Sequence, residues 1–228
     1  MTLLHKLYEQ RFVFFNVTLI MILFGPLVIP PVLFESVFAP LFFSVNILAG
    51  ILLISKKKGP QKIFIVVLIS TILTYVISAF YKSEADSFAF VRYSILFLFY
   101  CVVTWEIVTQ VWKSEYVNQI VILGLIGGYL CLGLIGFFIC NFIEMIMPGS
   151  FNGIVERAVD PSQNREGLFY FSFITLMSIG YGDIAPVGKV ARNAAVFIGL
   201  IGQFYTVILT AIVVGKFINQ LNTDHSNS

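Results

Sequence analysis

Charged residues are scarce in this chain, because Asp, Glu, Lys and Arg together make up only 11% of its 228 residues. A soluble domain carries about 25% charged residues, so this chain has too few of them to cover its surface in water. Its formal net charge of +2 is too small to indicate a nucleic-acid partner. Hydrophobic residues make up 58% of the chain. Lipid must therefore be part of the solvent around the folded protein.

Cysteine and histidine are also rare, which excludes several kinds of chemistry. Cys101, Cys131 and Cys140 all lie in apolar runs, and an odd number of such thiols is typical of core filling. His5 and His225 lie near opposite ends of the chain and form no ligand cluster. The sequence contains no phosphate-binding loop and no nucleophile triad. We therefore expect neither enzymatic activity nor a bound cofactor.

Long apolar runs are what the chain has in abundance. A helix that crosses a bilayer needs about 20 mostly apolar residues. Six segments meet this requirement, at residues 12–34, 37–55, 63–81, 87–103, 117–147 and 189–219. Pro26, Pro30 and Pro31 are expected to kink or end the first of them. The sequence predicts an all-α membrane protein with six transmembrane helices.

Basic residues in the short connections predict how these helices are oriented. Short loops rich in Lys and Arg favour the cytoplasmic side of a membrane. The basic residues that fall on one side are Lys6, Arg11, Lys56, Lys57, Lys58, Lys62 and Lys113. Both termini are then cytoplasmic, and the loop before the last span is external. We interpret Glu156 and Glu166 in that loop as solvating charges, although acids there, with Asp160, also raise the local cation concentration.

Residues 104–116 differ in character from the spans on either side. Trp105, Val108, Trp112 and Tyr116 share one helical face, and polar residues share another. This pattern is typical of an amphipathic helix that lies at the inner membrane interface. The alternative is that span four continues to Trp112, and we favour the interfacial helix.

The segment "TLMSIGYGD" at residues 175–183 gathers flexible and polar groups in an otherwise apolar chain. The apolar run before it is too short to cross the bilayer, and irregular backbone at membrane depth must be buried in protein or line a water-filled path. We expect Gly180 and Gly182 to adopt positive φ, so that successive carbonyls point the same way. Several copies around an axis would form rings of oxygens that replace the water of a monovalent cation. The carbonyl end of the short helix, near Ser178, would add a favourable field.

This segment resembles the potassium-channel signature, in which two threonines precede GYGD. The filter sequence TVGYG is the general form of that motif. Ser178 stands where the second threonine is usual, so the hydroxyl is kept but is held less firmly without a β-branch. The resemblance implies K⁺ binding at Ser178, Ile179, Gly180 and Tyr181, with Gly182 completing the selectivity filter. Retention of Tyr181 implies selectivity for potassium.

The resemblance extends over about half of the chain. "EMIMPGSF" before the filter and "IGQFYTVILTAIVVG" after it resemble bacterial six-span ion channels of the two-span-pore superfamily. This implies a homotetramer in the bacterial inner membrane, with a re-entrant pore helix and filter between helices five and six. The domains are then a peripheral four-helix region at 1–103, a linker helix at 104–116, a pore domain at 117–222 and a cytoplasmic tail at 223–228.

Residues near the filter are candidates for its support. We expect Thr175 and Asp183 to support it, with Asp183 hydrogen-bonded behind it. Glu144 either braces the filter or is a solvated acid at a helix end. Gly202 lies nineteen residues after Asp183, as the hinge glycine of related channels does, and close helix packing is the equal alternative.

One face of span six is expected to line the ion path. Gln203, Thr206 and Thr210 share this face and would be the cavity lining, with interhelical hydrogen bonding as the alternative. Val214 and Phe217 are candidates for an apolar constriction at the inner end.

Span four carries one basic residue, Arg92, and spans two and three carry no acid. Steep voltage gating uses about three to four charges per subunit. We therefore expect a channel that is not strongly voltage-gated, with Arg92 as an interfacial anchor. The rival interpretations are a weakly voltage-dependent channel, a non-conducting regulatory or structural subunit, and part of an active uptake system. The single GYGD and the lack of an internal repeat argue against the last.

Overall fold

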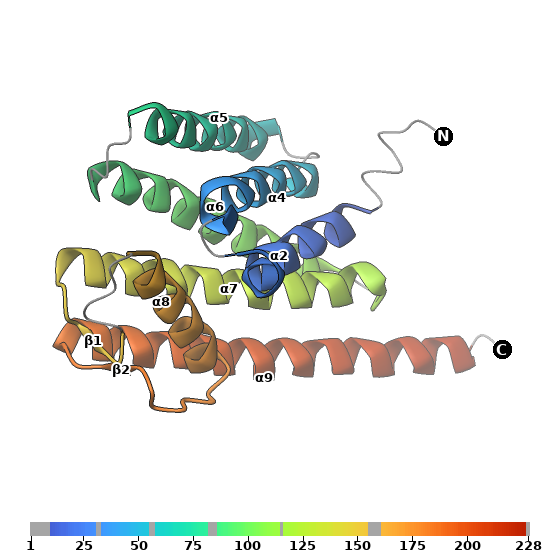
Figure 1. Cartoon of the computed structure of the whole chain (residues 1–228). Helices are drawn as coiled ribbons and strands as arrows, with labels where there is room; N and C mark the ends of the chain where they lie inside the picture. The colour runs from blue at the N-terminus through green and yellow to red at the C-terminus, as the bar shows by residue number, and fades with distance from the viewer. Residues whose placement is uncertain are drawn as a thin grey trace. The chain divides into compact units, whose positions relative to one another are not determined.

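The computed structural model describes residues 10–30, 33–54, 58–81, 86–114, 116–154 and 161–226. It divides into two compact units, Met1–Glu106 and Ile107–Ser228, and each is described by itself. Helices form most of both units (Figure 1). The loop acids Glu156 and Asp160, and the basic residues Lys6, Lys56 and Lys57, lie outside the described residues.

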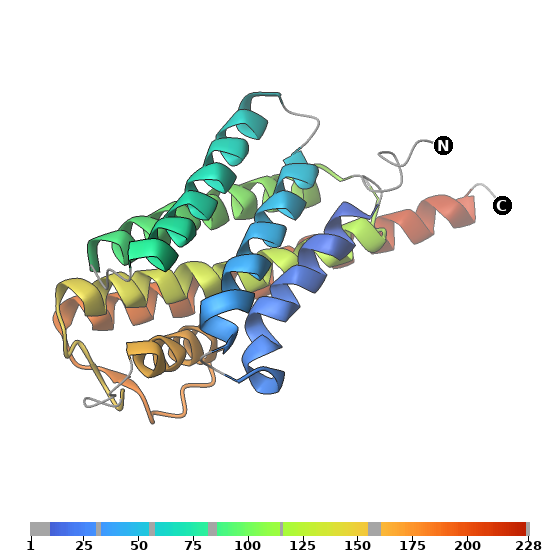
Figure 2. The same ribbon diagram turned by 45° about the horizontal axis from the view of Figure 1, so that its top comes forward.

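The first unit contains α2 (Arg11–Val28), the π-helical turn η1 (Phe34–Phe38), α4 (Ala39–Ile54), α5 (Lys58–Tyr81) and the first part of α6 (Asp86–Lys113). Helices α2 and α4 run side by side, and α5 packs against α4 (Figure 2). The first predicted span ends earlier than residue 34, because Ile29 is extended, with φ −108° and ψ 132°. The reason is Pro30, since a residue before proline avoids the helical region.

A cluster of buried polar side chains ties α2, α4 and α6 together. The Asn46 amide donates to the hydroxyl of Thr18 at 2.7 Å and to the carbonyl of Phe15 at 3.2 Å. The Tyr100 hydroxyl donates to the Asn46 amide oxygen at 2.9 Å. Asn46 and Tyr100 are fully buried. Aromatic packing surrounds this cluster, since the rings of Phe99 and Tyr100 lie 5.0 Å apart.

Helix α6 continues without a break through the segment that we predicted to be a separate interfacial helix. Residues 104–113 extend span four, and the chain leaves the helix only after the Ser114 amide has bonded to the Gln110 carbonyl. The cause is the absence of any glycine or proline between Val103 and Trp112, so nothing interrupts the backbone ladder. At 28 residues, α6 is about 42 Å long, which exceeds the hydrocarbon core of about 30 Å.

Five helices among the described residues are long and apolar enough to cross a membrane. They lie at Arg11–Val28, Ser36–Leu53, Phe88–Lys113, Gln119–Ile146 and Lys189–Gln220. Helix α5 also has an apolar stretch at Phe64–Tyr75 within the part of the chain that the structure describes. The structure thus supports an all-α, multi-pass membrane protein, and the count of six spans stays a prediction.

The second unit is a helical hairpin with a short helix beside it. Helix α7 (Gln119–Ile146) begins at Asn118, whose side chain accepts the Val121 amide proton at 3.1 Å and so caps the helix. Helix α9 (Lys189–Ser226) packs along α7, and α8 (Pro161–Leu176) contacts both (Figures 1 and 2). Because α9 reaches Ser226, the predicted tail at 223–228 is helical over most of its length.

Glycines in α7 let the neighbouring helices come close. A Cβ at Gly133 would overlap the ring of Phe173 from α8, and one at Gly128 would overlap the hydroxyl of Tyr205 from α9. The Ser172 hydroxyl of α8 also donates to the Gly133 carbonyl at 3.1 Å. The glycines thus leave room for aromatic side chains of α8 and α9, and this allows the three helices to pack closely.

Candidate functional site

Helix α8 ends in a Schellman cap, and this cap begins the "SIGYG" segment. The Ile179 amide donates to the Ile174 carbonyl at 2.9 Å, and the Ser178 amide donates to the Thr175 carbonyl at 3.0 Å. The residue at the turn, Ser178, has φ 58°. Glycine is usual at this position, because the left-handed conformation crowds a Cβ. The supporting group that Thr175 supplies here is its backbone carbonyl.

The backbone of the segment alternates in handedness. Ser178, Gly180 and Gly182 have φ of 58°, 56° and 82°, whereas Ile179 and Tyr181 have negative φ. The predicted positive φ at both glycines is confirmed, and Ser178 adds a third that the sequence did not indicate. Such alternation turns successive carbonyls toward the same side of the strand. A Cβ at Gly180 or Gly182 would meet no atom within 4 Å, so the requirement for glycine is conformational.

In the single chain, no other part of the protein that the structure describes covers the "SIGYG" segment. Residues 177–183 are all exposed, and the apolar side chain of Ile179 is 48% exposed. The Tyr181 side chain is 72% exposed. Exposed aromatic and aliphatic groups beside bare backbone mark an interaction surface.

A side chain of α9 reaches the first residue of this segment. The Gln203 amide nitrogen donates to the Ser178 hydroxyl at 2.9 Å. The preceding residue, Gly202, is buried, and a Cβ there would overlap the carbonyl oxygen of Leu176 at the end of α8. Close packing therefore accounts for Gly202, and a hinge at this glycine remains a prediction.

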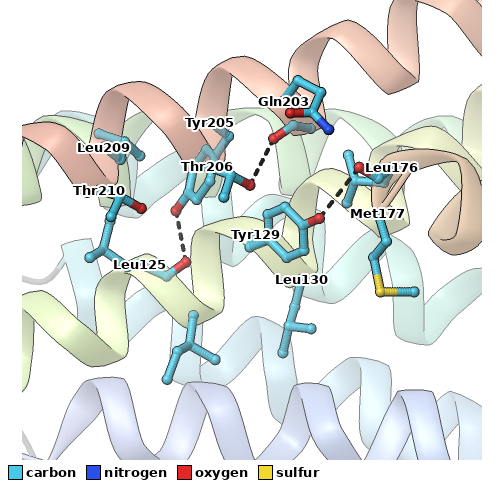
Figure 3. Close-up of a pocket in the computed structure, with 12 residues that line it drawn as sticks. Leu125, Tyr129, Leu130, Leu176, Met177, Gln203, Tyr205, Thr206, Leu209 and Thr210 are labelled. Atoms are coloured by element: carbon cyan, nitrogen blue, oxygen red, sulfur yellow. Dashed lines mark hydrogen bonds between the residues drawn. The ribbon is translucent and has the colours of Figure 1, made fainter. Parts of the chain in front are cut away.

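A pocket of about 570 Å³ opens where α7, α9 and the end of α8 meet (Figure 3). The Tyr129 hydroxyl lies 3.4 Å from the Leu176 carbonyl, and the Tyr205 hydroxyl donates to the Leu125 carbonyl at 2.8 Å. The polar side chains of α9 that line the pocket are Gln203, Tyr205, Thr206 and Thr210. Gln203, Thr206 and Thr210 thus face one pocket (Figure 3), and their role as the lining of an ion path stays a prediction.

The two candidates for a constriction lie further along α9. Val214 and Phe217 are 50% and 48% exposed and do not line the pocket. Between them, Lys216 donates to the carbonyls of Val111, Trp112 and Ser114 at 3.2, 2.7 and 2.6 Å. A cation on the carbonyl end of a helix is favourable. Lys216 thus fastens the second half of α9 to the end of α6. In the sequence, the hint of this role is that Lys216 is a single cation in an apolar run.

Glu144 braces the chain near the outer end of α7. Its carboxylate accepts the amide protons of Gly149 and Ser150 at 2.6 and 3.1 Å. The carbonyl of Ser150 in turn accepts the amide proton of Val187 at 2.8 Å. Two short strands follow the same pairing, β1 (Phe151–Asn152) with β2 (Ala185–Pro186). Glu144 therefore braces, through Ser150, the segment that follows residues 178–182, and its support of a filter stays a prediction.

The backbone of Asp183 packs against Gly153. A Cβ at Gly153, which has φ 88°, would overlap the backbone oxygen of Asp183. Desolvation, then a hydrogen bond to Asp183 and its negative charge, raise the pKa of the Tyr170 phenol above its ordinary value. Tyr170 thus lies beside Asp183, and support of a filter by Asp183 stays a prediction. Neither Gly153 nor Tyr170 was predicted, although "FNG" is a turn signal.

Residues 124–219 match a family model described as an ion channel. The match covers α8, the segment after it and most of α7 and α9, and it supports an ion-channel family for this part of the chain. No curated protein and no solved structure matched the chain. The second unit is thus similar to an ion-channel domain, and this similarity points to a transport protein in a membrane rather than to an enzyme.

Proposed function

We propose that this chain is one subunit of a potassium-selective channel that conducts K⁺ passively through a homotetrameric pore. The observation that carries the proposal is the alternation of positive φ at Ser178, Gly180 and Gly182 with negative φ between them. Such a strand presents a ladder of carbonyl oxygens on one side. Four copies around an axis would give rings of oxygens that replace the hydration shell of K⁺, with Tyr181 fixing the width of the filter.

The exposure of this segment supports assembly from several chains. One copy supplies oxygens on one side only, and it leaves Ile179 and Tyr181 largely bare. Partner subunits would cover these side chains and complete the rings. The face of α9 with Gln203, Thr206 and Thr210 would then line a cavity below the filter, and the constriction at Val214 and Phe217 would close it.

The proposal includes weak or absent voltage gating and both termini in the cytoplasm of a bacterium. In α6, Arg92 is the one basic residue before Lys113 at the helix end, and its guanidinium lies 4.7 Å from the centre of the Tyr75 ring. This cation–π contact favours a fixed anchor. Moving a single charge across the field yields about 2.3 kcal/mol per 100 mV, which is too little for steep gating.

The test is K⁺ flux into liposomes that contain the purified full-length chain, with Na⁺ as the competing ion. Wild-type protein is expected to pass K⁺ and exclude Na⁺. The substitution Gly180→Ala is expected to lower K⁺ flux by about a hundredfold, because alanine disfavours the φ of 56° that orients the carbonyls.

The control is Gly215→Ala in α9, where a Cβ would also meet no atom within 4 Å and which lies outside the filter. This variant is expected to retain flux. Wild-type vesicles without potassium-selective flux would overturn the proposed function. Full selective flux through the Gly180→Ala variant would overturn the assignment of the filter.

A further inference from the structure

We propose that Gln203 is a positioning residue for the innermost cation site, holding the Ser178 hydroxyl in the orientation that ligates the ion. The inference deepens the proposed function and rests on it, since it concerns the inner end of the same filter. It assigns Gln203 a role that differs from lining the cavity, because the side chain would act through Ser178 and not on the ion directly.

The hydroxyl of Ser178 needs such a partner. The Schellman cap fixes the backbone of this residue, through the amides of Ser178 and Ile179. The side chain is not fixed in the same way, because serine has no β-branch and can occupy three rotamers about χ1. It is also exposed, so close packing within its own chain does not confine it. A ring of four freely rotating hydroxyls would be a poorly defined ion site.

The hydrogen bond from Gln203 supplies the missing restraint. Its amide nitrogen donates to the Ser178 hydroxyl oxygen at 2.9 Å, which selects one rotamer. A hydroxyl oxygen has two lone pairs. The amide proton occupies one, and the second remains for a cation. Donation from a neutral amide therefore orients the oxygen without adding a charge that would alter the attraction of the ion.

Helix α9 holds Gln203 next to Ser178, because it packs closely against the end of α8. The absence of a side chain at Gly202 allows α9 to touch the carbonyl of Leu176, which lies two residues before Ser178 in the sequence. The Thr206 hydroxyl donates to the Gly202 carbonyl at 2.9 Å on the same helix (Figure 3). A group held on a packed helix positions a ligand better than one on a loop.

The test compares K⁺ and Na⁺ flux of full-length variants in liposomes. Gln203→Met keeps the length of the side chain and removes the donor. It is expected to lower the K⁺/Na⁺ permeability ratio by about two- to tenfold, the range that one neutral hydrogen bond supports, while flux persists. Gln203→Leu is the second variant if the first does not assemble.

Ser178→Gly is the control background, because glycine keeps the left-handed backbone and lacks the hydroxyl. If Gln203 acts through Ser178, Gln203→Met has no further effect on the ratio in this background. A ratio equal to that of the wild type in the single variant, or an equal fall in both backgrounds, would overturn the inference. Loss of selective flux in the wild type would instead contradict the proposed function.

Discussion

The two units differ in where key polar groups lie, which is inside the first unit and on the surface of the second. In the first unit, Asn46, Thr18 and Tyr100 are buried and hydrogen-bond to one another. In the second unit, the residues from Ser178 to Asp183 are exposed, and their backbone alternates in handedness. The first arrangement is complete within one chain, whereas under the proposed function the second is completed by other subunits.

This difference separates packing from function in a protein with few polar groups. Inside a membrane an unsatisfied polar group is costly. The hydrogen bonds within the buried cluster satisfy its polar groups, and this accounts for their presence. The exposed segment has no such explanation within one chain. Its shape is held by the contacts around it, which we call the frame. The frame consists of the cap at the end of α8, the close glycine contacts and the hydrogen bonds of the neighbouring backbone. The predictions below therefore target the frame first and the buried cluster last.

The largest effect is expected from Gly202→Ala. The added Cβ would overlap the Leu176 carbonyl, which is backbone and cannot rotate away. Overpacking of this kind costs about 1–3 kcal/mol, and displacement of α9 would also separate Gln203 from Ser178. We expect both a lower unfolding temperature and loss of selective flux, measured by thermal unfolding in detergent and by liposome flux.

Gly215→Ala is the control on the same helix, since a Cβ there would meet no atom within 4 Å. Alanine is favoured over glycine in a helix by about 1 kcal/mol, so this variant should be at least as stable as the wild type. A Gly202→Ala protein with unchanged stability and flux would show that the contact with Leu176 does not set the position of α9.

The second effect concerns the brace at Glu144. Glu144→Ala removes both acceptors of the Gly149 and Ser150 amides. Hydrogen bonds to a charged group contribute about 1.5–3 kcal/mol, and a smaller loss is expected here because one of these bonds is exposed and the other is part-buried. We expect faster hydrogen exchange at Val187, whose amide bonds to Ser150, and reduced K⁺/Na⁺ selectivity. Glu144→Gln retains one oxygen acceptor, so its hydrogen exchange at Val187 and its K⁺/Na⁺ selectivity are expected to lie between those of the wild type and the alanine variant. Unchanged exchange at Val187 in the alanine variant would argue that Glu144 acts on the turn alone.

The sequence predicted most of the helices because apolar length is a strong signal in a membrane protein. It placed α7 within two residues at its start, and it predicted positive φ at Gly180 and Gly182 from the need to align carbonyls. The end of α6 was predicted too early, because the amphipathic pattern around Trp105 does not reveal whether the backbone ladder is interrupted. A helix ends where a breaker or a cap ends it, and none lies there.

The contacts around the site were harder to predict for a different reason. They join residues far apart in sequence, as between Gln203 and Ser178 or between Lys216 and Trp112. Composition and periodicity indicate which face of α9 is polar but not which carbonyl or hydroxyl each side chain meets. The left-handed φ of Ser178 was hidden as well, because it follows from the cap bonds at the end of α8 and not from the residue type.

The last prediction tests whether the buried cluster is as independent of conduction as the comparison implies. Asn46→Ala removes the partner of Thr18, Phe15 and Tyr100 together. Interhelical hydrogen bonds in membranes contribute about 0.6 kcal/mol each on average, so a loss of about 1–2 kcal/mol of stability is expected. Tyr100→Phe, which deletes one of these bonds and keeps the ring, should cost less than half as much. Thermal unfolding and liposome flux measured on the same preparations separate the two outcomes, because folded protein of either variant is expected to keep the K⁺/Na⁺ ratio of the wild type. A changed ratio in the Asn46→Ala protein would break the comparison, since it would mean that the packing of the first unit reaches the filter.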